Sequence, residues 1–532
     1  MIEFFVRRFQ TRPDGTHDEA GIAMVIAITI VMLMTLIPLA IYTQAIQQLP
    51  LARHDQDHEA ALAAAEAGVD DYLNRLAQNQ NYWNYNAGNP PPDGNKAFTQ
   101  WVPVSSGVGT NNEYFRYDVN ATQTTSTGIL YLTASGKSRS VIRTVKLGLR
   151  RQGFLDYLWL TDYEITDPTL SGASATNCKY HAWEWNPTFN NFGPNDTSNC
   201  SVVYWTSLST LNGPVHSNDG LYVCGSPTFN GDTDTYYNSV TSKNVFHSTQ
   251  FGGPGTVLNP LACSNSPNFS RANDPASGSL LAFPPANTSL RTLADGAQGG
   301  TGCLYTGPTT ITLNSNGTMT VASAATKSTN SGCGPGSNKN LPANGVIYVQ
   351  NIPTSHSDPN YSACSGAACN GDVNLSGTLK GQLTIASQDN ITIVGNTVYH
   401  QYPGGTDVLG LVADNDIAVY HPVDGNGNNQ AGSLSNPTID AAMLALNHSF
   451  YVQNWASGAP LGNLTVNGVI TQEFRGPVGT FSGSPPVIVS GYNKNYTYDT
   501  RLKYLSPPFF LNPTQSAWTR ISYAELTPNP AP

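Results

Sequence analysis

The chain has 532 residues, enough for two or three domains with a large buried core. Charged residues make up only 11 % of it and aromatic residues 10 %, with 49 Gly and 36 Pro. This composition is typical of extracellular proteins built from short strands and polar turns, and it disfavours a helical cytosolic enzyme. The net charge of −10, without a cluster of basic residues, argues against nucleic acid as a partner.

An apolar stretch near the N-terminus predicts a transmembrane helix over residues 21–46. Its first part, Gly21 to Tyr42, carries no charge and would cover roughly 33 Å as a helix, enough to cross a bilayer core. A secretory signal core is shorter, about 7–15 residues, so simple removal is not expected. Residues 1–20 are predicted to form a cytoplasmic leader, with the bulk of this single-pass protein outside the cytoplasm, because basic residues precede the stretch: Arg7, Arg8 and Arg12.

The following segment predicts an amphipathic stalk helix over residues 47–78. Apolar residues spaced by three and four share one face of it. This predicted packing face consists of Leu62, Ala65, Val69, Leu73 (or its neighbour Tyr72) and Leu76. The mostly small residues from Ala60 to Gly68 leave a smooth stripe that permits close approach of another helix. A stalk helix lying on its own domain is the alternative, and the two interpretations are compatible.

Two short stretches carry a family resemblance. Gly21-Ile-Ala-Met-Val-Ile-Ala and Ala63-Ala-Ala-Glu-Ala-Gly-Val-Asp resemble the N-terminal region of type IV pilins, and more closely the PilX-type minor pilin family. The resemblance covers roughly residues 15–80. It implies a helix that enters the shared core of a pilus or pseudopilus, with other pilins as its partners.

The resemblance also implies a leader that is processed at Gly21 and Ile22. Pilins cut by the prepilin peptidase keep a glutamate five residues after the scissile glycine, where this chain has Ile26. The glutamate is thought to help align a pilin with the terminal amine of its neighbour. PilX-type proteins often lack it, so this departure is consistent with the family.

Residues 79–152 predict a loop followed by a small antiparallel sheet. Asn, Gly and Pro dominate up to Thr110 and indicate the loop. Three segments with apolar–polar alternation then predict strands, at residues 113–119, 128–137 and 140–151. A long helix packed on a small meander is the plan of a pilin.

Residues 153–490 predict a large parallel β-helix, or β-solenoid, with long loops. A motif of an apolar run, a small residue, a polar corner and a second apolar run recurs, with its small residue at Ala386, Ala413 and Ala445. An ordinary β-sandwich is the alternative. Residues 491–532 predict an aromatic-rich cap for the open end of the solenoid, and a carbohydrate-stacking surface is the alternative there. Its aromatic residues are Tyr492, Tyr496, Tyr498, Tyr504, Phe509 and Phe510.

All eight cysteines lie beyond the apolar stretch, which favours disulfides in an oxidising compartment. A zinc site is the alternative, but no CxxC pair or Cys/His grouping at ligand spacing occurs. Only Cys364 and Cys369 are close enough in sequence to predict a local pair.

Candidate chemistry is confined to the polar corners. Asp389, Asp414 and Asp416 could line a glycan-active site, yet Asp at such corners more often binds its own backbone. His216 and His448 are expected to be surface turn residues. Asp424 to Asn429 begins like a calcium loop but lacks the glycine at the sixth place and the acid at the twelfth. We therefore predict no catalytic residue, cofactor or metal site.

The predicted fold is thus mainly β, with an N-terminal transmembrane and amphipathic helix, a small pilin-like sheet and a β-solenoid. The predicted function is a non-enzymatic minor pilin-like component that displays the solenoid for assembly priming or adhesion. Its expected partners are other pilins, membrane lipid, and a glycan or a host or abiotic surface. The alternatives are a membrane-anchored polysaccharide-active enzyme and a stand-alone surface adhesin.

Overall fold

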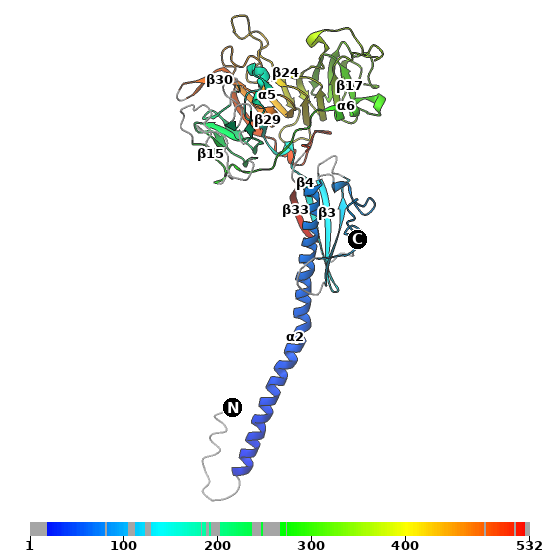
Figure 1. Ribbon diagram of the computed structural model, residues 1–532, viewed down its shortest axis with the longest axis vertical. Coiled ribbons are helices and arrows are strands. Elements are labelled where there is room, and N and C mark those ends of the chain that lie inside the picture. Colours follow the sequence, from blue (N-terminus) through cyan, green and yellow to red (C-terminus); the bar gives the residue numbers. More distant parts are fainter. Residues whose placement is uncertain are drawn as a thin grey trace. The chain divides into compact units, whose positions relative to one another are not determined.

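The computed structural model divides into two compact units, which we describe separately (Figure 1). Unit 1 comprises Met1–Asn120, Tyr131–Gly148 and Ser522–Pro532, and unit 2 comprises Ala121–Leu130 and Leu149–Ile521. The fold is mainly β with an N-terminal apolar helix and a small antiparallel sheet, which confirms that part of the prediction. The structure describes residues 19–79, 82–104, 112–122, 129–181, 184–187, 191–192, 200, 203–236, 246–247, 266–272, 274–483, 486–514 and 518–526.

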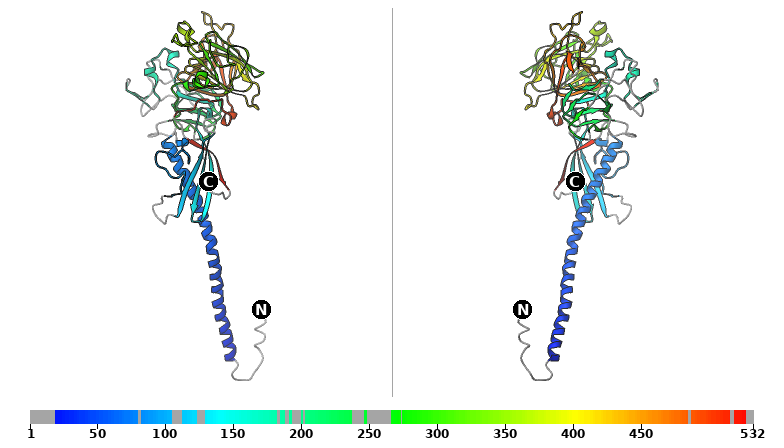
Figure 2. Two further views of the ribbon diagram at one scale, coloured as in Figure 1. Left: turned by 90° about the vertical axis from the view of Figure 1, so that its right-hand side faces the viewer. Right: turned by 90° about the vertical axis from the view of Figure 1, so that its left-hand side faces the viewer.

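One helix dominates unit 1. Helix α2 runs without a break over Glu19–Gln78, so the predicted transmembrane and stalk segments are a single element. Its Ile22–Gln44 segment has a mean hydropathy of 2.7 and is long enough to span a membrane. In Figures 1 and 2 the N-terminal half of α2 extends beyond the small sheet. Residues 1–18 of the predicted leader lie outside the described residues. Its last two residues, Glu19 and Ala20, begin helix α2.

The small sheet has five strands in the order β1-β2-β3-β4-β33. The three predicted strands are present as β2, β3 and β4, and β2 pairs antiparallel with β1 and β3. The structure differs from the prediction at the C-terminus. Residues 491–532 were predicted to form one cap and tail, but β33 pairs with β4 in the small sheet. The strands are β1 (Val102–Pro103), β2 (Glu113–Asn120), β3 (Ile129–Ser138), β4 (Val141–Arg151) and β33 (Trp518–Leu526), and the loop contains η1 (Tyr82–Asn84).

The C-terminal half of α2 packs on this sheet through small residues. Ala61 and Ala65 are fully buried, and Gly136 on β3 faces them so closely that a Cβ built on it would lie 2.1 Å from the carbonyl oxygen of Ala61. Two turns further, Tyr72 packs edge-on against Tyr117 with ring centroids 5.3 Å apart. The Ala-rich stretch therefore brings the helix backbone within reach of the strand backbone, which larger side chains would prevent.

Unit 2 contains a sheet of 21 strands that are mostly parallel, with antiparallel pairs at β18–β19 and β19–β20. Its longest row of parallel neighbours is, in spatial order, β17 (Cys303–Thr306), β21 (Val346–Gln350), β23 (Gln382–Ser387), β25 (Val408–Ala413), β27 (Thr438–Ala445), β29 (Asn463–Phe474), β5 (Trp159–Tyr163), β10 (Val215–Ser217), β13 (Thr233–Thr235) and β16 (Ala276–Ser277).

Two further rows complete this sheet. The first contains β18 (Thr309–Asn314), β22 (Val373–Leu379), β24 (Ile391–Tyr399), β26 (Ile417–Val419) and β28 (Phe450–Val452). The second starts beside β29 with β32 (Asn493–Tyr498) and continues through β9 (Thr210–Asn212), β12 (Thr228–Phe229) and β15 (Asn268–Phe269). The antiparallel pairs add β19 (Thr318–Ser323) and β20 (Gly336–Asn340).

The remaining elements of unit 2 are short. Two-stranded pairs are β30 (Gly479–Ser482) with β31 (Val487–Gly491) and β6 (Trp185–Asn186) with β7 (Asn191–Phe192). A three-stranded sheet contains β14 (Phe246–His247), β11 (Leu221–Cys224) and β8 (Trp205–Thr206). The helices are η2 (Phe154–Asp156), α4 (Pro168–Ser171), α5 (Ala175–Cys178), α6 (Thr288–Ala294), η4 (Gly296–Gln298), η5 (Gly366–Cys369) and η6 (Thr500–Lys503).

The chain path through the longest row is not sequential. It begins in the middle with β5, proceeds through β10 and β13 to β16, and resumes at the opposite end with β17. From there it returns strand by strand to β29, which pairs with the other side of β5. Trp159 on β5 therefore has Val215 as its partner on one side and Ile470 on the other.

The repeated alanines lie inside unit 2 and nearly share one register. Ala413 and Ala445 are direct Cα partners across β25 and β27. Ala386 is opposite Val412, one residue away from the expected position. All three alanines are fully buried, so the motif marks the core-facing ends of neighbouring strands.

The aromatic segment and the cystines also belong to unit 2. Strand β32 lies between β29 and β9 within the sheet, so Tyr496 and Tyr498 are core residues of an inner strand, whereas Tyr504 is 75 % exposed. This differs from the predicted cap over an open end. The disulfides formed by described residues include Cys178–Cys200, Cys303–Cys333 and Cys364–Cys369.

Candidate functional site

The apolar segment of α2 is the first candidate site. Its large side chains are exposed to between 43 and 69 % from Ile22 to Tyr42, and none is covered by another described part of unit 1. Thr29 and Thr35 turn their hydroxyls back onto helix carbonyls at 2.8–3.0 Å, so their polar groups are satisfied within the helix. Such a surface needs lipid or other apolar helices around it.

In the second half of α2, most of the predicted packing face contacts the sheet of unit 1. Ala65, Val69 and Leu76 are buried against the sheet of unit 1, while Leu62 and Leu73 are only half-buried. Tyr72, the alternative to Leu73, is fully buried. The small-residue stripe is thus engaged by the chain's own sheet, and the exposed apolar surface lies further toward the N-terminus.

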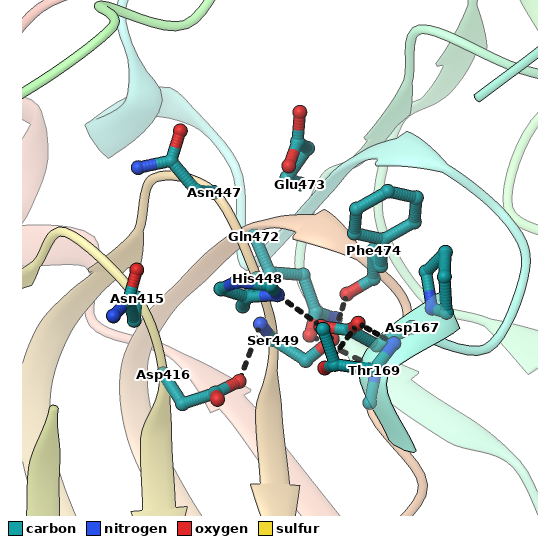
Figure 3. Close-up of polar contacts among 12 residues, drawn as sticks. Asp167, Thr169, Asn415, Asp416, Asn447, His448, Ser449, Gln472, Glu473 and Phe474 are labelled. Atoms are coloured by element: carbon teal, nitrogen blue, oxygen red, sulfur yellow. Dashed lines mark hydrogen bonds and ion pairs between the residues drawn. The ribbon is translucent and has the colours of Figure 1, made fainter. Parts of the chain in front are cut away.

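A cluster of polar side chains in unit 2 is the second candidate site (Figure 3). Asp167, which precedes α4, accepts hydrogen bonds from the Thr169 backbone at 2.7 Å and from Nδ1 of His448 at 2.8 Å. His448 lies in the turn between β27 and β28. Asp416, in the turn between β25 and β26, accepts the backbone N–H of Ser449 at 3.0 Å.

This cluster is the group of described residues whose geometry suits a metal ion. One carboxylate oxygen each of Asp167 and Asp416 and a ring nitrogen of His448 lie within 4.8 Å of one another. Asp167 and His448, two of these three residues, are already joined to each other by a hydrogen bond. The geometry therefore fits an internal ion pair that holds the segment after β5 against the β27–β28 turn.

The electrostatics of the cluster follow from burial and pairing. The hydrogen bond to Asp167 raises the pKa of His448 and outweighs burial, which opposes the charge. Burial also opposes ionisation of Asp167, but the hydrogen bonds from His448 and Thr169 keep its pKa below the usual value. Burial raises the pKa of Asp416 to about 6.

These directions predict a pH-dependent contribution to stability. The His448 pKa is raised, so its contribution is complete below about pH 6.5 and is lost as the pH rises through the folded-state value. The Asp167 pKa is lowered, so its contribution is lost only in acid. We expect His448→Gln to lower the free energy of unfolding by about 1–2 kcal/mol at pH 5.5 and by clearly less at pH 8.5.

Urea midpoints of the full chain in detergent, followed by tryptophan fluorescence at both pH values, test this. His400→Gln is the control, because His400 is exposed in the same unit. An equal loss at both pH values would contradict a charged Asp167–His448 pair.

The other candidate carboxylates bind turns. Asp414 accepts the backbone N–H of Asn287 at 2.8 Å. Asp389 accepts Asn415 Nδ2 at 2.7 Å and so links two successive corners. Burial raises the pKa of Asp414 to about 6, as for Asp416. Asp424 accepts the backbone N–H groups of Asn426 and Asn428 at 2.8 Å each and so closes its own loop.

Sequence reasoning placed His216 wrongly. It was expected on the surface, but its side chain is fully buried, with Nδ1 bonded to Asp234 and Nε2 3.0 Å from Asn218 Oδ1. The strand β10 points this residue inward, and the polar partners on neighbouring segments satisfy its two ring nitrogens.

A buried ionic cluster was missed altogether. Glu164 and Arg475 are both fully buried and joined at 2.9 Å, and the Arg475 guanidinium lies 3.6 Å from the Trp205 ring centroid. Lys494 is nearby, with its amine 5.3 Å from the same ring centroid. Glu164 and Arg475 directly follow β5 and β29, and Lys494 lies in β32, so the sequence signal was a charged residue within or directly after an apolar strand.

The family found by comparison with known proteins matches the segment that holds the first candidate site. Residues 20–70 match the family model described as PilX N-terminal, and the match lies wholly within α2. No curated protein is significantly similar to the chain. Among solved structures, the competence-associated pilin ComZ from Thermus thermophilus aligns at 13 % identity over 88 % of this chain and 97 % of its own length, with a TM-score of 0.26. The family match covers the apolar helix, so residues 20–70 are similar to the N-terminal region of PilX-type pilins.

Proposed function

We propose that the protein is a non-enzymatic minor pilin-like component of a type IV pilus or pseudopilus. The segment Ile22–Gln44 would hold it in the membrane, with the N-terminus cytoplasmic, and then enter the shared helical core of the filament. The observation that carries this proposal is the exposed apolar surface of α2 within a segment that matches the PilX family. Processing at Gly21 and Ile22 belongs to the same proposal.

We further propose that unit 2 is a β-solenoid displayed for assembly priming or adhesion. Parallel neighbouring strands, with Ala413 and Ala445 in register across β25 and β27, support the solenoid. The size of unit 2 supports a position at the tip or in priming, because a body of this size would crowd the shaft of a helical filament. A glycan or a host or abiotic surface would then be its partner.

The test is a single charge in the middle of the apolar segment. Leu33→Arg is expected to cost about 2.5–3.5 kcal/mol of membrane insertion, because a guanidinium must enter hydrocarbon. The measurements are resistance to alkaline extraction from membranes and co-purification with the pilins of a pilus-assembling host. We expect both to be lost.

Ala52→Arg is the matched control, because Ala52 is exposed beyond the apolar segment and beside Arg53. It should retain both properties. The proposal would fail if Leu33→Arg behaved like the control, or if the unaltered chain stayed in the membrane without capturing any pilin.

A further inference from the structure

A cavity in unit 2 combines an apolar wall with a lysine that forms no ion pair with any described residue. It has a volume of about 80 Å³, and its lining includes Lys494, Tyr204, Tyr492, Phe481 and Ile488. The β30–β31 pair contributes Phe481 and Ile488, and Phe481 is 49 % exposed. The cavity is about half the size of an apolar cavity that admits benzene, about 150 Å³.

Lys494 occupies an inward position of its strand. Its Cα partner on β29 is Leu464, which is fully buried. The amine lies beside two aromatic rings that pack against each other, 5.3 Å from the centroid of Trp205 and 5.9 Å from that of Trp159. A lysine at such a position is costly unless an anion or another strong acceptor meets it.

No described residue supplies that anion. Among the ion pairs of the described residues, the nearby carboxylate of Glu164 is joined to Arg475, and Lys494 has no carboxylate within 4.0 Å. The charged groups that act on the amine are Arg475, after β29, and Glu164, after β5. The other titratable side chains of the cavity are the tyrosines Tyr204 and Tyr492. The cavity therefore has net positive character at its inner end.

We propose that this cavity binds a carboxylate group on a short apolar stem, with the carboxylate on Lys494 and the stem against Phe481 and Ile488. The volume admits a group of the size of propionate. A free short-chain acid or the side chain of a glutamate in a partner would present the same chemistry. The site is independent of the proposed role of α2.

Binding should depend on pH in a defined direction. Burial lowers the pKa of Lys494 to about 7 in the free protein, and a bound carboxylate would raise it. The complex thus takes up a proton, and the affinity should be constant just below pH 7 and fall as the pH rises above it.

The experiment measures dissociation constants on the full chain in detergent by saturation-transfer NMR at pH 6.5 and pH 8.5. Propionate is compared with propionamide, which has the same shape without the charge. We expect propionate to bind about tenfold more tightly than propionamide at pH 6.5, with a smaller preference at pH 8.5. Lys494→Gln should abolish the preference, whereas Lys494→Arg should retain it.

Control variants separate a loss of binding from a loss of folding. A peptide probe distinguishes a free acid from the glutamate side chain of a partner. Lys380→Gln, an exposed lysine in the same unit, should change nothing. Phe481→Ala at the rim should weaken propionate and propionamide alike. A preference for the peptide acetyl-Ala-Glu-Ala-amide over its Gln analogue would indicate a partner side chain, and binding of propionate alone would indicate a free acid. Equal affinity for propionate and propionamide, or an unchanged preference in Lys494→Gln, would overturn the proposal.

Discussion

Replacement of Glu164 by alanine is expected to destabilise unit 2 by about 3–5 kcal/mol, because it leaves the Arg475 guanidinium buried without its carboxylate. Both side chains are fully buried, and Arg475 also donates to the carbonyl oxygens of Val203, at 2.7 Å, and Tyr204, at 3.4 Å. Those neutral acceptors cannot balance its charge. The second oxygen of Glu164 accepts the hydroxyl of Thr161, so the variant also removes a buried acceptor.

The measurement is urea unfolding of the full chain in detergent, followed by tryptophan fluorescence, since Trp205 lies directly against the guanidinium. The double variant Glu164→Gln with Arg475→Met is the decisive comparison. It removes both charges together and should recover most of the loss. A loss below about 1 kcal/mol in Glu164→Ala would mean that water or another group compensates Arg475.

Gly136→Ala is expected to weaken the docking of α2 on the small sheet by at least about 3 kcal/mol. A Cβ at this position would lie 2.1 Å from the carbonyl oxygen of Ala61 and 2.2 Å from the backbone nitrogen of Ala65. Both contacts are with backbone, so no side-chain rotation can relieve them. The helix and β3 must move apart, which opens the buried layer around Tyr72 and Leu76.

Hydrogen exchange of the amides in β2, β3 and β4 reports this effect within unit 1. Faster exchange is expected across these strands, while the apolar segment of α2 should be unchanged. Gly88→Ala is a suitable control in the same unit, because the nearest atom to its new Cβ would be an Asn86 side-chain oxygen at 3.3 Å. Unchanged exchange in Gly136→Ala would show that the helix backbone yields easily at Ala61.

Local patterns predicted the elements whose formation depends on local physics. The apolar run and the three-and-four spacing after it gave α2, and apolar–polar alternation gave β2 to β4. The recurring small residue located the ends of β23, β25 and β27. These patterns extend over a few helical turns or a single strand. At that scale the spacing of apolar residues directly reflects which face of the element is buried.

Long-range partners could not be predicted in the same way. Asp167 stands in a polar turn, and nothing near it indicates His448, 281 residues later. Glu164, Arg475 and Lys494 are charged residues in or directly after apolar strands. Their proximity to one another follows only from the long-range pairing of those strands. The position of β33 beside β4 likewise depends on a pairing across most of the chain.

The meeting of β5 and β29 has a consequence for biogenesis. Glu164 and its partner Arg475 are 311 residues apart, so during synthesis the first strand of the large sheet emerges long before its final neighbour. Until then β5 keeps an open edge, which is prone to wrong pairing. The cystines Cys178–Cys200, Cys303–Cys333 and Cys364–Cys369 each span 30 residues or fewer and can close early. A partly synthesised polypeptide would therefore hold locally tied loops beside an open strand edge that only β29 can later pair.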